Sequence, residues 1–109
     1  MKTYALTLDL KEDAQLMAEY EQYHRQVWPE VRQSILDAGI VDMNIYRFHT
    51  RLFMVMKVED DFSFEKKAKM DEGNLRVQEW EQLMWKFQQP LPEAKEGEKW
   101  MLMNEIFSL

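Results

Sequence analysis

A phenol, an imidazole and an indole are spaced along one face of a helix predicted in the N-terminal third of the chain. Tyr20, His24 and Trp28 are each four residues apart, and Pro29 and Glu30 follow directly. Side chains four residues apart lie on the same face of an α-helix. Histidine titrates near neutral pH, and a tyrosine one turn away makes it a good proton-transfer pair. This stripe predicts acid–base chemistry carried by His24 and Tyr20.

Ordinary core packing is the other interpretation of the stripe, because Tyr and Trp at helical spacing are more often simply buried. Even so, an imidazole buried beside a phenol needs a hydrogen-bond partner, since burying it unpaired is unfavourable. The chain has one further histidine, His49, between two predicted strands. We interpret His49 as a solvated turn residue, which leaves His24 as the candidate for proton transfer.

Composition excludes several other kinds of site. The chain has no cysteine, which rules out a disulfide framework, a thiolate-ligated metal and a thiol nucleophile. Two histidines without metal-ligand spacing predict no transition-metal centre. The three glycines are scattered, at positions 39, 73 and 97, so no phosphate-binding loop is predicted. We therefore expect a reaction that uses neither a metal nor another cofactor.

The charge balance limits the possible partners. Twenty acidic and fourteen basic residues give a formal net charge of −6, which is unsuited to nucleic acid or to an anionic membrane surface. Asp9 interrupts the apolar N-terminal stretch, and no apolar run reaches the ~18 residues of a transmembrane helix. We expect a cytoplasmic protein that binds neither nucleic acid nor membrane.

The hydrophobic pattern predicts the elements that must position the stripe. Alternation indicates strands at 2–10, 40–48 and 51–59, and residues 100–107 resemble a closing strand. Apolar spacings of three and four indicate helices from the N-cap Asp13 towards Pro29, from Pro29 to Ala38, from Ser63 to Asp71, and from Gly73-Asn74 to about Phe87. Gly39 closes the second helix as a left-handed cap.

This order of elements predicts a single α+β domain over residues 1–109. The βαββαβ order, with split helices, is typical of a ferredoxin-like sandwich with one antiparallel sheet. Residues 51–58 are apolar on both faces, although such a sheet has helices on only one. Because large apolar surfaces are seldom left exposed, we expect a second copy to cover the other face, giving a homodimer. Cover by the C-terminal segment is the alternative.

The stripe also carries a resemblance to a known family. The run Tyr20-x-x-x-His24-x-x-x-Trp28-Pro29-Glu30 resembles the signature helix of the L-rhamnose mutarotase family. The likeness covers nearly the whole chain and includes Asn44-Ile45-Tyr46, Leu52-Phe53, Gln78-Glu79-Trp80 and Glu105-Ile106-Phe107. The resemblance implies a cytoplasmic dimer, a dimeric α+β barrel, that interconverts the α and β anomers of a deoxyhexose without a cofactor.

The resemblance implies roles for individual residues. His24 matches the family's catalytic histidine, acting as acid towards the ring oxygen and later as base. Tyr20 matches a sugar-contacting tyrosine that positions the histidine or relays a proton. Trp80 matches the first of two adjacent tryptophans, but Glu81 replaces the second, and Met43 stands where a sugar-contacting tyrosine is common. The expected substrate-binding residues are Tyr20, Trp28, Met43, Trp80 and Glu81.

These departures favour L-fucose over L-rhamnose, the alternative sugar. The two 6-deoxyhexoses differ in configuration at C2 and C4, and the Glu81 carboxylate can accept hydrogen bonds from two neighbouring hydroxyls. Alternatively, Glu81 faces solvent on its helix.

A different class of function also suits this fold, which hosts cofactor-free monooxygenases and small-ligand-binding proteins. Nine methionines and the aromatic residues could line an apolar pocket for such a ligand.

Overall fold

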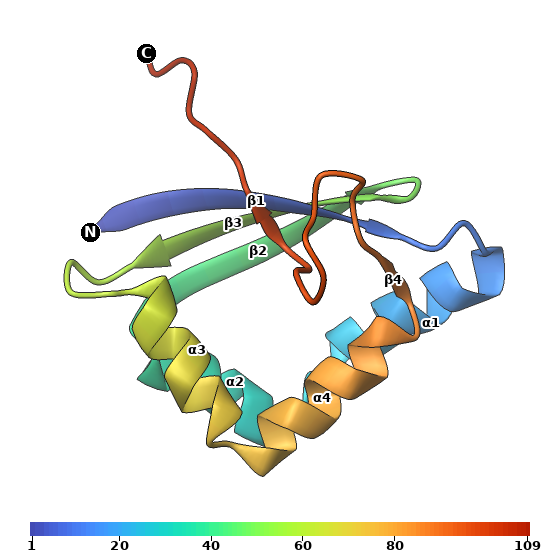
Figure 1. The fold of residues 1–109 in the computed structure, drawn as a ribbon, viewed down its shortest axis with the longest axis horizontal. Coiled ribbons are helices and arrows are strands. Elements are labelled where there is room, and N and C mark those ends of the chain that lie inside the picture. Colours follow the sequence, from blue (N-terminus) through green and yellow to red (C-terminus); the bar gives the residue numbers. More distant parts are fainter.

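One antiparallel sheet carries four helices on one of its faces (Figure 1). The computed structural model describes residues 1–109. The strands are β1 (Lys2–Leu10), β2 (Ile40–Phe48), β3 (Arg51–Val58), β4 (Gln88–Gln89) and β5 (Met101–Leu102); the helices are α1 (Ala14–Arg25), α2 (Pro29–Asp37), α3 (Phe64–Glu72) and α4 (Leu75–Trp85). The strand order is β2-β3-β1-β4, and β5 also pairs with β1. The predicted ferredoxin-like α+β fold with split helices is confirmed.

The helices α1 and α2 begin and end near the capping residues that the sequence predicts. The Asp13 side chain accepts a hydrogen bond from the backbone N–H of Leu16 at 3.0 Å and so caps α1. Pro29 is the first residue of α2, where its missing N–H removes no helical bond. Gly39 follows α2 with a φ of 91°, a conformation that favours glycine. No helix of the protein combines the length and the apolar character needed to cross a membrane.

The core is divided into two clusters, one at each end of the sheet's inner face. The first cluster contains Leu10, Met17, Tyr20, Val31, Leu52, Trp80, Met84 and Phe87. The second contains Leu6, Ile40, Met54, Met56, Val58 and Phe62. Ile35, Ile45 and Trp100 pack against both clusters. In Figure 1 the helices beneath the sheet form a V, with α4 on one arm and α3 on the other.

The opposite face of the sheet is also apolar along β3, as the sequence predicts. Along β3, Leu52, Met54 and Met56 are buried, whereas Phe53 and Val55 alternate with them and are only partly covered. Tyr46 is the register partner of Phe53 on β2, and the two rings lie 6.3 Å apart. No helix covers this face (Figure 1). The sheet thus has one face in the core and an apolar face without an intramolecular partner.

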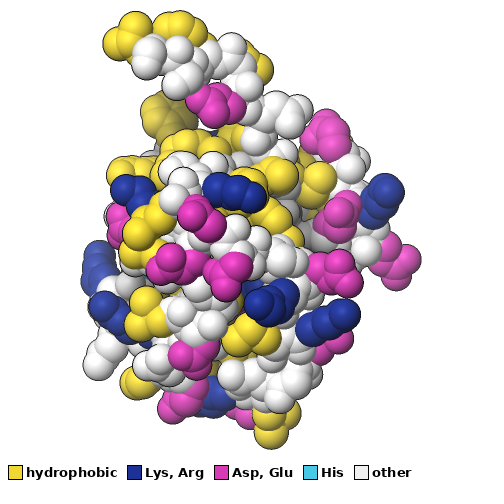
Figure 2. Space-filling model, turned by 90° about the vertical axis from the view of Figure 1, so that its left-hand side faces the viewer, with side chains coloured by type: hydrophobic (Ala, Val, Ile, Leu, Met, Phe, Trp, Pro, Cys, Tyr) yellow, Lys and Arg dark blue, Asp and Glu magenta, His cyan; other side chains and the backbone are white.

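The C-terminal region differs from the prediction. The closing strand expected at 100–107 is only Met101–Leu102, which pairs with Leu6 and Thr7 of β1. A strand that the pattern did not predict, β4, pairs with Asp9 and Leu10 further along β1. Helix α4 correspondingly ends at Trp85 rather than near Phe87. After Met103 the chain leaves the sheet and projects from the body (Figures 1 and 2). Its apolar residues Ile106, Phe107 and Leu109 are exposed. This segment does not cover the outer face of the sheet.

Candidate active site

A cavity of about 520 Å³ lies between the sheet and the helices, in the gap between the two core clusters. That volume is within the usual range for small-molecule sites. The sheet side of the cavity is apolar, lined by Leu6, Met43, Ile45, Met54 and Met56. Helix side chains supply the polar and aromatic groups, among them Tyr20, His24, Trp80 and Glu81. Five residues that the stripe or the resemblance singled out therefore meet in one cavity: Tyr20, His24, Met43, Trp80 and Glu81.

His24 is held by a hydrogen bond to its own helix. Its Nδ1 lies 2.8 Å from the backbone carbonyl oxygen of Tyr20, one turn earlier. A carbonyl only accepts hydrogen bonds, so Nδ1 carries the proton of the neutral imidazole and Nε2 carries the lone pair. Nε2 has no partner in the protein, while His24 lines the cavity. Burial lowers the pKa of His24 below its ordinary value of 6.5, against the opposing effect of the carbonyl. At neutral pH the imidazole is a free proton acceptor.

Tyr20 supplies the complementary group, a phenol that stays protonated. Burial raises its pKa to about 12; the hydrogen bond from Gln88 opposes this shift and the nearby charge of Glu81 adds to it. The ring lies 4.3 Å from the His24 ring between centroids and also packs against Phe87. The Tyr20 hydroxyl is therefore a hydrogen-bond donor, and not a base, at any ordinary pH. Acceptor and donor stand one helical turn apart, as the spacing predicts.

Trp80 and Trp28 meet, but only Trp80 reaches the cavity. Trp80 lines the cavity wall, and its ring lies edge-on to His24 with centroids 5.6 Å apart. Trp28 packs behind it at 5.1 Å, and the Arg76 guanidinium covers the Trp28 ring at 3.8 Å. Trp28 is absent from the cavity lining. Trp28 therefore lies behind Trp80 and outside this cavity, and its expected contact with the substrate stays a prediction.

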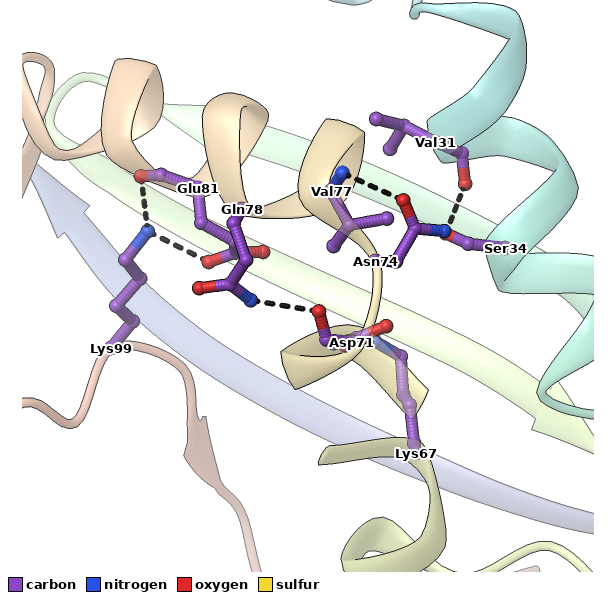
Figure 3. A network of polar contacts seen from close by, with 9 residues as sticks. All are labelled: Val31, Ser34, Lys67, Asp71, Asn74, Val77, Gln78, Glu81 and Lys99. Carbon is purple, nitrogen blue, oxygen red and sulfur yellow. Dashed lines mark hydrogen bonds and ion pairs between the residues drawn. The ribbon is translucent and has the colours of Figure 1, made fainter. Parts of the chain in front are cut away.

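The two departures from the family pattern both lie on the cavity wall. Met43 contributes an apolar side chain from β2. The Glu81 carboxylate lies 2.8 Å from the Lys99 ammonium, which also donates to the Glu81 backbone oxygen (Figure 3). The Lys99 ammonium lies over the Trp85 ring at 4.6 Å, and its side chain is 11% exposed. Glu81 therefore does not simply face solvent: it belongs to an ion pair at the cavity edge.

Several cavity residues escaped the sequence analysis. Gln88, Lys99 and Trp100 line the cavity from β4 and the segment that leads into β5. Ser34 and Lys67 line it from α2 and α3, and Lys67 pairs with Asp71 within its own helix. A glutamine after a helix and a lysine in a charged loop resemble surface residues, so no signal in the sequence marked them. His49, by contrast, lies in the exposed β2–β3 turn, paired with Glu12 at 3.0 Å, as expected.

The chemistry available to the cavity is proton transfer to a small polar ligand. It combines an acceptor with lowered pKa, a donor with raised pKa, an aromatic wall and an ion pair. Such perturbed groups in one apolar concavity mark a candidate active site. The structure contains no group of three or more His, Cys, Asp or Glu side chains placed to hold a metal ion.

Solved structures share this fold. The chain superposes on an L-rhamnose mutarotase from Formosa agariphila with a TM-score of 0.74 and 22% identity, covering 100% of this chain and 99% of the other. It also superposes on tetracenomycin F2 cyclase, a polyketide cyclase from Streptomyces glaucescens, with a TM-score of 0.63, 13% identity and the same coverage. At these identities the likeness establishes the fold alone.

Sequence comparison establishes the family. The chain is 46% identical over 111 residues to an L-fucose mutarotase from Xanthomonas campestris, covering 100% of this chain and 89% of that protein. It is 37% identical over 115 residues to a UPF0734 protein from Dictyostelium discoideum, covering 99% of this chain and 90% of that protein. The family model described as L-rhamnose mutarotase matches residues 3–109. Together with a cavity that unites Tyr20, His24 and Trp80, this places the chain in the L-rhamnose mutarotase family.

Proposed function

We propose that this protein interconverts the α and β anomers of L-fucose by acid–base catalysis without a cofactor. Family membership makes the chain a sugar mutarotase, an isomerase, and favours this function over a monooxygenase or a ligand-binding protein. One observation carries the proposed mechanism: the free Nε2 of His24 and the protonated hydroxyl of Tyr20 line the same cavity. We propose a cytoplasmic location for the reaction, as the resemblance implies.

The proposed reaction moves one proton out of and back onto the sugar. His24 Nε2 takes the proton from the anomeric hydroxyl, the bond between C1 and the ring oxygen breaks, and Tyr20 donates a hydrogen bond to the developing alkoxide. The imidazolium then gives its proton to that oxygen, leaving an open-chain aldehyde. Rotation about C1–C2 and the reverse steps form the other anomer. In this proposal His24 acts as a base first and as an acid second, because its Nε2 carries the lone pair in the neutral form. This is the reverse of the order expected from the sequence.

L-Fucose is the proposed sugar on two grounds. The curated relative with 46% identity is an L-fucose mutarotase. The ion pair of Glu81 and Lys99 offers both an acceptor and a donor at the cavity edge, since one ammonium hydrogen and one carboxylate oxygen have no partner. A sugar with an axial C4 hydroxyl can present one continuous C–H face to Trp80, with the C4 hydroxyl pointing away from that face and the equatorial hydroxyls along the ring edge. A polar pair suits that hydroxyl edge better than a second tryptophan.

We propose that the active form is a homodimer whose interface includes the outer face of β3. Phe53 and Val55 lie on this face, and exposed Tyr46 and Phe48 from β2 extend it. Large apolar surfaces of this kind usually mark an interface. Pairing two such sheets face to face would give the dimeric α+β barrel that the resemblance implies.

Replacement of the proposed base tests the mechanism. His24→Ala is expected to lower the catalysed rate of anomer exchange by roughly two to four orders of magnitude, the usual contribution of a positioned acid–base group. His49→Ala is the matched control and is expected to keep the parent rate, because His49 lies in an exposed turn. Exchange is measured by magnetization-transfer NMR, and folding by circular dichroism. A folded His24→Ala protein with the parent rate would contradict the role of His24.

The dependence on pH provides a second prediction. Catalysis requires neutral His24, whose pKa is lowered by burial, so the rate is constant near neutrality and falls as pH decreases through that pKa. The midpoint of this decrease, after subtraction of the uncatalysed rate, is expected below 6.5. A midpoint at or above 6.5 would mean that the group controlling the rate is not this desolvated imidazole.

The sugar preference is tested by comparing exchange of L-fucose and L-rhamnose at equal concentration. The parent protein is expected to act faster on L-fucose. Glu81→Trp, which introduces the residue common in the family, is expected to shift the ratio of the two rates towards L-rhamnose. Faster exchange of L-rhamnose by the parent would refute the choice of sugar and leave the mutarotase reaction intact.

The dimer is tested on its outer sheet face. Phe53→Lys is expected to give monomers or aggregates, because it places a charge in the proposed apolar interface. Leu75→Lys makes the same kind of change at an exposed position of α4 and is expected to leave the association state unchanged. Sedimentation equilibrium measures the mass of each variant, and a parent protein that is monomeric at micromolar concentration rules out the dimer.

A further inference from the structure

Gln88 is a polar side chain at a position of the sheet that faces the core. In the register of β1 and β4, Gln88 lies opposite Leu10, a buried member of the first core cluster. Directly opposed residues of an antiparallel pair face the same side of a sheet. The Gln88 side chain accordingly points to the inner face and is 3% exposed. It is the single polar residue among the buried residues of the protein.

The amide of Gln88 makes one hydrogen bond and leaves one polar atom unpaired. Its Nε2 donates to the Tyr20 hydroxyl oxygen at 3.4 Å, and its Oε1 is buried with no partner. Exchanging the amide's oxygen and nitrogen would leave the other atom unpaired instead. An unpaired buried polar atom destabilises the folded state, and native proteins contain few of them. An apolar side chain of similar size would avoid this penalty.

The hydrogen bond from the Gln88 amide affects which hydrogen bonds the Tyr20 hydroxyl can make. A phenol oxygen accepts hydrogen bonds and donates one. When the Gln88 amide occupies an acceptor site, the Tyr20 O–H keeps its donor function for the cavity, where His24 and the sugar lie in the proposed reaction. The bond is long at 3.4 Å, and such bonds commonly shorten when substrate binds. Gln88 itself need not touch the sugar.

We propose that Gln88 is a positioning residue for catalysis: it orients the Tyr20 hydroxyl towards the substrate, at a cost to the stability of the core. This inference rests on the proposed mutarotase mechanism, in which Tyr20 donates to the ring oxygen. It gives β4, a strand of two residues, a function beyond closing the edge of the sheet. It also assigns a role to a residue that neither the helical stripe nor the family resemblance indicated.

The test is a double-mutant cycle on Tyr20 and Gln88. Tyr20→Phe removes the hydroxyl and keeps the ring, and is expected to lower kcat for L-fucose exchange by roughly ten- to a hundredfold. Gln88→Met keeps the length of the side chain and is expected to lower kcat by about tenfold with little change in KM. In the Tyr20→Phe background, Gln88→Met is expected to cause no further loss, because its target is gone.

A merely structural role of Gln88 predicts different results. In that case the reduction in kcat caused by Gln88→Met would multiply with the reduction caused by Tyr20→Phe. Gln88→Met would also lower the melting temperature. We expect the opposite for stability: the melting temperature of Gln88→Met equals or exceeds that of the parent by a few degrees, because the unpaired amide atom is removed. Gln89→Met, the same change at the exposed neighbour in β4, is the control and is expected to keep the parent kcat.

The outcomes separate the inference from the function on which it rests. A parent protein that does not accelerate anomer exchange of L-fucose or L-rhamnose refutes the proposed function, and the inference falls with it. An active parent with fully active Gln88→Met refutes the inference alone. Multiplicative losses in the double mutant, or a lower melting temperature of Gln88→Met, refute it as well.

Discussion

The unfilled space between the sheet and its helices is the constraint on which the rest of the structure depends. Apolar burial stabilises a fold by about 25 cal/mol per Å², so a small two-layer protein gains most by closing its helices over the whole sheet. Here the buried side chains form two clusters, and residues of all four helices line the space between them. The middle remains a cavity of about 520 Å³. The candidate site exists because the helices and the sheet do not bury all of the apolar surface between them.

The same space determines the chemical state of the groups around it. His24 and Tyr20 are removed from bulk water, and desolvation is the largest influence on both pKa values. Desolvation disfavours whichever form is charged. It therefore lowers the pKa of the imidazole and raises that of the phenol. A single physical cause provides a neutral acceptor and a neutral donor, which is the combination that transfer of one proton between two sugar oxygens requires.

Segments far apart in the chain are joined at the cavity edge by polar contacts as well as by apolar packing. Lys99 reaches Glu81 across 18 positions of sequence, and Gln88 reaches Tyr20 across 68. The Lys99 side chain is almost buried, so its charge requires the carboxylate. Through this pair the charged loop before β5 is tied to α4 (Figure 3). Trp100, the next residue after Lys99, lines the cavity. An acidic residue in place of a second tryptophan thus changes how the wall is held as well as its polarity.

The sequence by itself determined the elements and the stripe of Tyr20 and His24, because both depend on local spacing. Alternating apolar residues specified β1, β2 and β3, the caps Asp13 and Gly39 specified helix ends, and four-residue spacing placed Tyr20 beside His24. Only the tertiary structure decided the remainder. Trp28 packs behind Trp80 and under the Arg76 guanidinium, which are both distant from it in sequence. Gln88 lines the cavity because β4 pairs with β1. Periodicity reports which way a side chain faces along its own element; what it faces depends on contacts between elements, which no local spacing encodes.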